Sequence, residues 1–190
     1  MVMLGLALTG CDSGATSSLA SVALSAAPPG YSAQPVGDNG ALSVDDASSA
    51  SPADPTSVRN FLNNSTFQGG FERVWTHGDD FITDLIYQFG DGATAVRFMT
   101  LETEQIKSFK GDYTYPAPQL GNGQGFVLYS TTRSGDKSVF CNGVWFTVSN
   151  RAFQLLDCSV NPGGATRVLE LAAQQYQQAG GSPAPSPIAS

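Results

Sequence analysis

The sequence has few of the side chains on which enzymes most often rely. Histidine occurs once, as His77, and cysteine three times among 190 residues. His77 lies beside Asp79 and Asp80, but one imidazole and two adjacent carboxylates lack the ligand spacing of a known metal site. A Ser-His-Asp site would have to use the same histidine, and no Gly-x-Ser-x-Gly motif accompanies it. We therefore predict no catalytic residue, no metal and no cofactor, and we expect a protein that is not an enzyme.

Long apolar runs and an excess of basic charge are also missing. No stretch approaches the ~18 consecutive apolar residues of a membrane-spanning helix. The net charge is −7, and all nine Lys and Arg residues lie between Arg59 and Arg167. Residues 55–179 contain these nine basic residues and eleven acidic ones, so no basic stripe is available to bind phosphates. The sequence therefore predicts no nucleic-acid partner.

The number of cysteines is odd, so one of them needs an explanation outside a disulfide. Cys11 ends the segment Leu8-Thr9-Gly10-Cys11. This segment resembles the lipobox of bacterial lipoproteins, in which a signal peptidase cuts before the cysteine and the thiol receives diacylglycerol. Residues 1–10 contain no Lys or Arg and are shorter than the ~15 to 30 residues of a whole signal peptide. We interpret them as a truncated or partial signal peptide; the alternative is an unmodified cysteine in a frayed N-terminus.

Composition divides the rest of the chain into three parts. Residues 12–54 are rich in Ser, Ala, Gly, Pro and Asp, with Tyr31 as their single aromatic residue. Such a segment buries too little apolar surface to offset the entropy cost of ordering, so we predict a lipidated cysteine and disordered tether over residues 11–54. Residues 180–190 have the same character and are predicted to form a disordered tail. One folded domain is expected over residues 55–179.

Hydrophobic periodicity in this domain alternates between the value of a strand and that of a helix. It predicts an α+β fold of order α-ββα-ββ(β)α, a two-layer sandwich in which helices cover one face of an antiparallel sheet. Residues 113–125 carry two prolines and are expected to cross over the sheet. The expected elements are, in order, a helix at 56–63, strands at 71–76 and 81–89, a helix within 90–106, strands at 126–132, 137–141 continuing into 144–149, and 151–160, and a helix from residue 165.

The two remaining cysteines are predicted to form a disulfide through the pairing of two strands. If Ser149-Asn150 is a two-residue hairpin loop, Cys141 faces Cys158 at a non-hydrogen-bonded site, where the backbones come closest. A second layout uses Asn142-Gly143 as the turn and still places both cysteines at one end of the sheet. In an oxidising compartment we expect the bridge to form; the alternative is two reduced, buried thiols.

The register of the first layout sorts the side chains of the hairpin onto two faces. One face is predicted to be core and receives Val144, Phe146, Val148, Phe153 and Leu155. The other receives Trp145, Thr147, Ala152, Gln154 and the disulfide. We expect Trp145 to pack against the disulfide; the alternative is that it forms part of a surface patch.

Aromatic residues supply the candidate ligand-binding site. Phe109, Tyr113 and Tyr115 lie outside the clearest strands and, together with Trp75, are the candidate binding residues. We expect them to line a groove where the Pro-rich segment passes over the sheet. The alternative is that they fill one end of the core.

A lipobox, a polar tether and an α+β domain with one disulfide together resemble the surface lipoproteins of high-GC Gram-positive bacteria, the actinobacterial type. The layout of the domain also resembles the extracellular sensor domain of mycobacterial PknH-type receptor kinases. These resemblances imply a membrane-anchored, extracytoplasmic module that binds a small molecule, a wall component or an envelope protein. The alternative is a structural or assembly protein of the cell envelope that acts through protein contacts.

The three cysteines allow anchoring to be separated from folding. Cys11→Ser is expected to release the protein from membranes or leave it unprocessed, because acyl CH₂ groups at ~0.8 kcal/mol each supply the membrane affinity. Cys141→Ser is expected to leave membrane attachment intact and to cost ~2 to 5 kcal/mol of stability. Fractionation and mass spectrometry of the N-terminal peptide, with the true upstream start restored, measure both effects. An unmodified Cys11 still joined to Gly10 in a cytosolic protein would contradict the predicted localisation.

Overall fold

The structure is a computed structural model. It describes residues 19–34, 39–108, 113–130, 139–160 and 165–182. Cys11 and residues 183–190 lie outside the described residues. In the described part of the chain, no helix is both long enough and apolar enough to span a bilayer.

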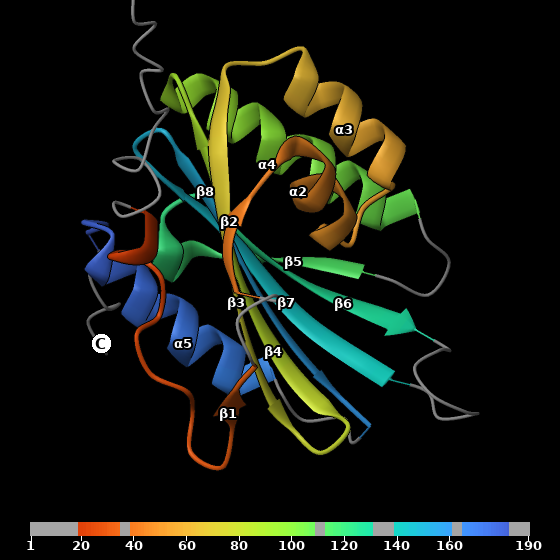
Figure 1. Ribbon diagram of the computed structural model, residues 1–190, viewed down its shortest axis with the longest axis vertical. Coiled ribbons are helices and arrows are strands. Elements are labelled where there is room, and N and C mark those ends of the chain that lie inside the picture. Colours follow the sequence, from red (N-terminus) through yellow and green to blue (C-terminus); the bar gives the residue numbers. More distant parts are fainter. Residues whose placement is uncertain (1–18, 35–38, 109–112, 131–138, 161–164, 183–190) are drawn as a thin grey trace, which may run out of the picture.

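The architecture is α+β, as the sequence predicts, and its centre is an antiparallel sheet of eight strands (Figure 1). The strand order is β1-β3-β4-β8-β7-β6-β5, and β2 also pairs with β3. The strands are β1 (Ser32–Ala33), β2 (Gly40–Leu42), β3 (Phe67–His77), β4 (Asp80–Phe89), β5 (Tyr113–Ala117), β6 (Gly123–Ser130), β7 (Val139–Val148) and β8 (Arg151–Ser159). The helices are α2 (Val44–Ala50), α3 (Pro55–Asn63), α4 (Gly92–Ser108) and α5 (Ala165–Gln178), with a 3₁₀ turn at Pro118–Leu120.

The β7–β8 hairpin has the predicted register. Val148 pairs with Arg151 across Ser149-Asn150, and Cys141 pairs with Cys158. The two cysteines form a disulfide with their Cα atoms 4.0 Å apart. The second layout, with a turn at Asn142-Gly143, is wrong because β7 runs unbroken through these residues. Trp145 and the disulfide lie in the same core cluster.

Both faces of the sheet are covered by helices. Leu85 and Tyr87 of β4 pack with α2, α3 and α4, whereas Ile82 and Ile86 of the same strand pack with α5. Figure 1 shows α2, α3 and α4 grouped on one side of the strands and α5 on the other. The expected single helical layer therefore holds for α2 to α4 but not for α5. The reason is that the central strands are apolar on both faces, and each face needs a cover.

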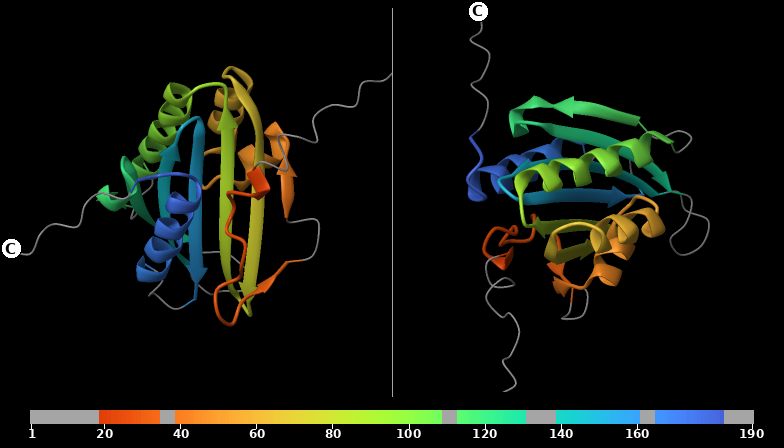
Figure 2. Two further views of the ribbon diagram at one scale, coloured as in Figure 1. Left: turned by 90° about the vertical axis from the view of Figure 1, so that its left-hand side faces the viewer. Right: turned by 90° about the horizontal axis from the view of Figure 1, so that it is seen from above.

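The predicted disordered tether is wrong for residues 19–34 and 39–54, which belong to the fold. We call these residues the strap. Its first part buries Leu19, Ala23 and Leu24 beside α5, and its last part places Ala47 against the opposite face. Between them, β1 and β2 pair with the outer edge of β3. In the left view of Figure 2 the first part of the strap and α5 lie in front of the strands.

Hydrogen bonds to a buried carboxylate fix the first part of the strap. Asp84 on β4 is fully buried and accepts from the backbone N–H of Leu24 at 2.8 Å and from Gln175 of α5 at 2.7 Å. Arg73, the partner of Asp84 across β3 and β4, donates to the Leu24 carbonyl. Burial raises the pKa of Asp84 to about 6, and the bonds from Gln175 and Leu24 oppose that rise. Strap, sheet and α5 thus meet at one polar contact.

The Pro-rich segment forms a strand that the sequence did not predict. Tyr113–Ala117 is β5 and pairs with β6 over Gly123–Val127. Pro116 is compatible with this because β5 is the outer strand, where a missing N–H costs little. β1, β2 and α2 were not predicted either, because they lie in the segment expected to be a tether. The helices and strands that the sequence did predict begin and end within a few residues of their expected positions in the described ranges.

Truncation of the chain tests whether the strap is part of the fold. A chain that begins at residue 19 is the reference, because it keeps every described residue of the strap. A chain that begins at residue 55 loses the strap cover of Trp75 and Ile82 and the Leu24 N–H that donates to Asp84, so it is expected to aggregate or to lose its dispersed amide NMR spectrum. An unchanged Tm for residues 55–190 would contradict the assignment.

Candidate functional site

The predicted aromatic groove is not formed by the residues that the structure describes. Trp75 is 2% exposed and lies in the core beneath the strap and α5. Tyr115 lies on β5, with four strands between it and β3 in the sheet. Phe109 and the side chain of Tyr113 lie outside the described residues. The prediction is wrong for Trp75, because strand order, which periodicity does not reveal, places it at the opposite edge from Tyr115.

Tyr115 has a packing role in the sheet. A Cβ atom placed on Gly125 would lie 2.1 Å from a ring carbon of Tyr115, its partner on β5. The ring therefore occupies the space above the glycine. Phe126 covers Gly143 of β7 in the same way. These pairs fill gaps in the sheet, and glycine is required at both positions.

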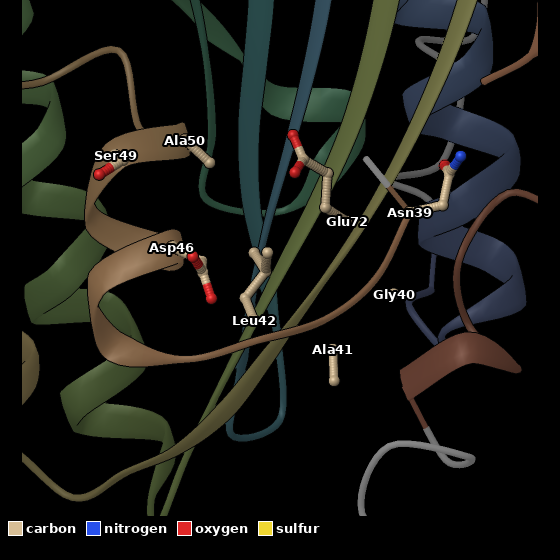
Figure 3. Close-up of a pocket in the computed structure, with 8 residues that line it drawn as sticks. All are labelled: Asn39, Gly40, Ala41, Leu42, Asp46, Ser49, Ala50 and Glu72. Carbon is tan, nitrogen blue, oxygen red and sulfur yellow. The ribbon is translucent and has the colours of Figure 1, made fainter. Parts of the chain in front are cut away.

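A groove of about 360 Å³ lies between the strap and β3. Its volume is within the range of small-molecule sites. Figure 3 shows Leu42 between the carboxylates of Asp46 and Glu72. The lining combines β2, α2 and β3 through Asn39, Gly40, Ala41, Leu42, Asp46, Ser49, Ala50 and Glu72.

Asn39 holds the strap against β3 at one end of this groove. Its Oδ1 accepts from the N–H of Val74 at 2.7 Å, and its Nδ2 donates to the carbonyl of Gln34 at 2.8 Å. One side chain thereby joins the segments that carry β1 and β2 to the same edge. The groove wall formed by β2 is fixed in place as a result.

A capping box fixes the wall formed by α2. The Ser43 hydroxyl accepts from the N–H of Asp46 at 3.2 Å, and the Asp46 carboxylate accepts from the Ser43 N–H at 3.3 Å and from its hydroxyl at 2.6 Å. Reciprocal bonds of this kind satisfy orphan donors at a helix start. Both bonds to the Asp46 carboxylate use Oδ2, so Oδ1 remains available at the groove among the described contacts.

Two buried polar contacts attach α2 to the sheet and to α4. Ser51, the residue after α2, donates to the carboxyl of Glu102 with Oγ 2.7 and 2.8 Å from its two oxygens. The Tyr87 hydroxyl donates to the Ala47 carbonyl at 3.3 Å. Burial raises the pKa of Glu102 to about 8, and the bond from Ser51 only partly offsets it. Burial likewise raises the pKa of Tyr87, with a further contribution from the nearby Glu102 charge.

The groove is suited to binding. Two carboxylates flank one apolar side chain, so the site can accept hydrogen bonds from hydroxyl or ammonium groups around a small apolar surface. No group of three or more His, Cys, Asp and Glu side chains that could hold a metal occurs in the described ranges. His77 is exposed at the β3–β4 turn, with its ring 5.7 Å from that of Tyr31. The sequence analysis did not predict this groove. The one local pattern that could have indicated it is Ser-x-x-Asp at residues 43–46, which is typical of a helix start and marks the α2 wall.

Comparisons with known proteins show little. No protein-family profile matches the chain, and no curated protein matches it. Among solved structures, the extracellular domain of PknH from Mycobacterium tuberculosis is similar, with a TM-score of 0.46 and 9% identity over 63% of this chain and 69% of that one. At this level the likeness is one of layout, and it assigns no ligand, partner or anchor to the chain.

The buried Glu102 predicts a dependence of stability on pH. Its pKa is raised by folding, so its contribution is complete below pH 4.5 and is lost as pH rises toward 8. Asp84, with a pKa of about 6, acts in the same direction at lower pH. Between roughly pH 6.5 and 8.5 the Tm is expected to fall, and in Glu102→Gln, which keeps an acceptor for Ser51, it is expected to be nearly flat.

Calorimetric scans across this window measure the effect. Glu104→Gln is the matched control, since Glu104 lies two residues away on α4 with its side chain 65% exposed. The control is expected to keep the slope of the unmodified protein. Parallel slopes for Glu102→Gln and Glu104→Gln would show that Glu102 is ionised in the folded protein throughout.

Proposed function

We propose that the protein is an extracytoplasmic, lipid-anchored binding module whose groove between the strap and β3 takes a small polar ligand. The groove carries this proposal, because the main chain of β2 and two flanking carboxylates form a concave surface of ligand size. Membrane attachment through Cys11 and a ligand from the cell envelope complete the proposal.

The disulfide supports an extracytoplasmic location. Cys141 and Cys158 are bonded across β7 and β8, and such bonds persist in oxidising compartments. The length of chain between Cys11 and the strap limits the distance to the membrane. Residues 12–18 separate Cys11 from the first described residue, and a fully extended chain of this length spans at most roughly 30 Å. An anchored domain would therefore lie close to the bilayer.

The groove favours a ligand that donates hydrogen bonds. Asp46 and Glu72 present acceptors on either side of Leu42, and ionised carboxylates accept but do not donate. An amino sugar matches this pattern, because its ammonium and hydroxyl groups are donors and its ring has an apolar face. A wall component of this chemistry is our preferred ligand class.

The alternative of an assembly protein predicts a flat, exposed apolar face. Among the described residues, Val96 is the one large hydrophobic side chain with an exposed fraction as high as 39%. One isolated valine does not make a patch. The outer strand β5 contains Pro116, which lacks the N–H that edge-to-edge pairing needs. The described surface therefore gives more support to ligand binding than to assembly.

Titration with glucosamine tests the proposed site. Addition of glucosamine to the ¹⁵N-labelled protein is expected to shift the amide signals of Gly40, Ala41 and Ser49, and Glu72→Gln is expected to weaken binding about tenfold, as for loss of a charge-assisted hydrogen bond. N-acetylglucosamine, which lacks the ammonium group, is expected to bind more weakly than glucosamine.

Glu104→Gln is the control for this titration as well, because it removes the same charge from an exposed site on α4. It is expected to leave the affinity unchanged. No shift at the groove with glucosamine, or equal weakening by both substitutions, would overturn the amino-sugar ligand. Thermal-shift screening of envelope extracts would then show whether a different ligand prefers the native state.

A further inference from the structure

A second groove lies on the opposite face of the molecule, between the strap and α5. It has a volume of about 430 Å³. One wall is the turn from Ala26 to Pro29 of the strap. The other wall is formed by Arg167, Glu170, Leu171 and Gln174, whose spacing places them on one stripe of α5. The groove shares no lining residue with the one between the strap and β3.

Arg167 is held in a fixed orientation at this groove. Its Nε and Nη2 donate to the two carboxylate oxygens of Asp157, each at 2.6 Å, and Nη2 also donates to the Tyr31 hydroxyl at 2.8 Å. The Asp157 side chain is fully buried, and the guanidinium lies 5.0 Å from the Tyr31 ring centre. Its Nη1 has no partner among the described residues, and Arg167 lines the groove. One donor group of a rigid fork is therefore available to a ligand.

The charges around Arg167 Nη1 determine which ligand head group it can bind. Asp157 neutralises Arg167 through the paired bonds, and Glu170 adds a negative charge at the groove wall. An anionic head group would thus meet a site of net negative charge, whereas a neutral carbonyl can accept from Nη1 without that repulsion. Apolar atoms of alanine, proline and leucine line much of the remaining surface and suit an aliphatic body.

We propose that this second groove binds a small molecule with an aliphatic body and a neutral carbonyl head group, such as an acyl amide, with Arg167 Nη1 donating to the carbonyl oxygen. The site is separate from the proposed amino-sugar groove. The two sites share only the strap, which supplies one wall to each.

Matched eight-carbon probes test the proposal on the whole chain. Octanamide is expected to shift the amide signals of Ala26, Ala27, Gly30 and Tyr31 and of residues 167–174 in a saturable way. Octanoate, which has the same chain but a charged head, is expected to bind at least about tenfold more weakly. Glu170→Gln removes the repelling charge and leaves the Arg167 and Asp157 pair in place, so it is expected to improve octanoate binding more than octanamide binding.

A groove-filling substitution locates the site. Gln174 is exposed on the groove stripe, so Gln174→Trp is expected to fill the groove and weaken octanamide binding at least tenfold without disturbing the fold. Gln177→Trp places the same side chain at an exposed position outside the groove lining and is expected to leave binding unchanged. Absence of saturable octanamide shifts, equal effects of the two tryptophans, or octanoate binding as tightly as octanamide would each overturn the proposal.

Discussion

Strand β4 is buried on both faces, and the rest of the fold depends on this constraint. Leu85, Ile86 and Tyr87 each have no exposed surface, although their side chains alternate between the two faces. A sheet with two apolar faces needs two covers. α4 and α5 each contact β7 and β8 from opposite sides, which leaves the β3 side of both faces to be covered by something else. The strap supplies that cover on the α5 face, shares it with α3 on the other face, and passes around the edge of β3 between them.

Both grooves follow from this arrangement. Each turn of the strap leaves a concave surface beside the element that it passes. The first groove lies where β2 turns into α2 over β3, and the second where the Ala26 to Pro29 turn passes α5. Each has one wall from the strap and one from the rest of the domain. Any ligand in either groove therefore stabilises the docked strap, since it binds only when both walls are present.

The sequence predicted best what depends on neighbouring residues. The β7–β8 register and the disulfide followed from a two-residue turn and period-two alternation, both local properties. The strap was missed because its buried residues are small or few, such as Ala23 and Ala47, and because its contacts are hydrogen bonds to distant partners such as Asp84. The prediction of an aromatic groove was wrong for a related reason. Periodicity indicates which face of the sheet Trp75 lies on, but strand order determines which residues lie beside it.

Two buried carboxyl groups decide where the strap docks. Asp84 accepts from Leu24 on one face, and Glu102 accepts from Ser51 on the other. Their raised pKa values, about 6 and about 8, show that each is held at a cost in desolvation, so neither is an efficient source of stability. These two carboxyl groups instead determine where the strap lies on the sheet. A strap of alanine and serine could lie on an apolar face in several registers with similar burial. Any shift would remove the donor that the strap gives to each buried carboxyl, and the loss of such a donor costs more than the contact itself provides. The polar contacts thus select one docked arrangement, and the geometry of both grooves depends on that selection.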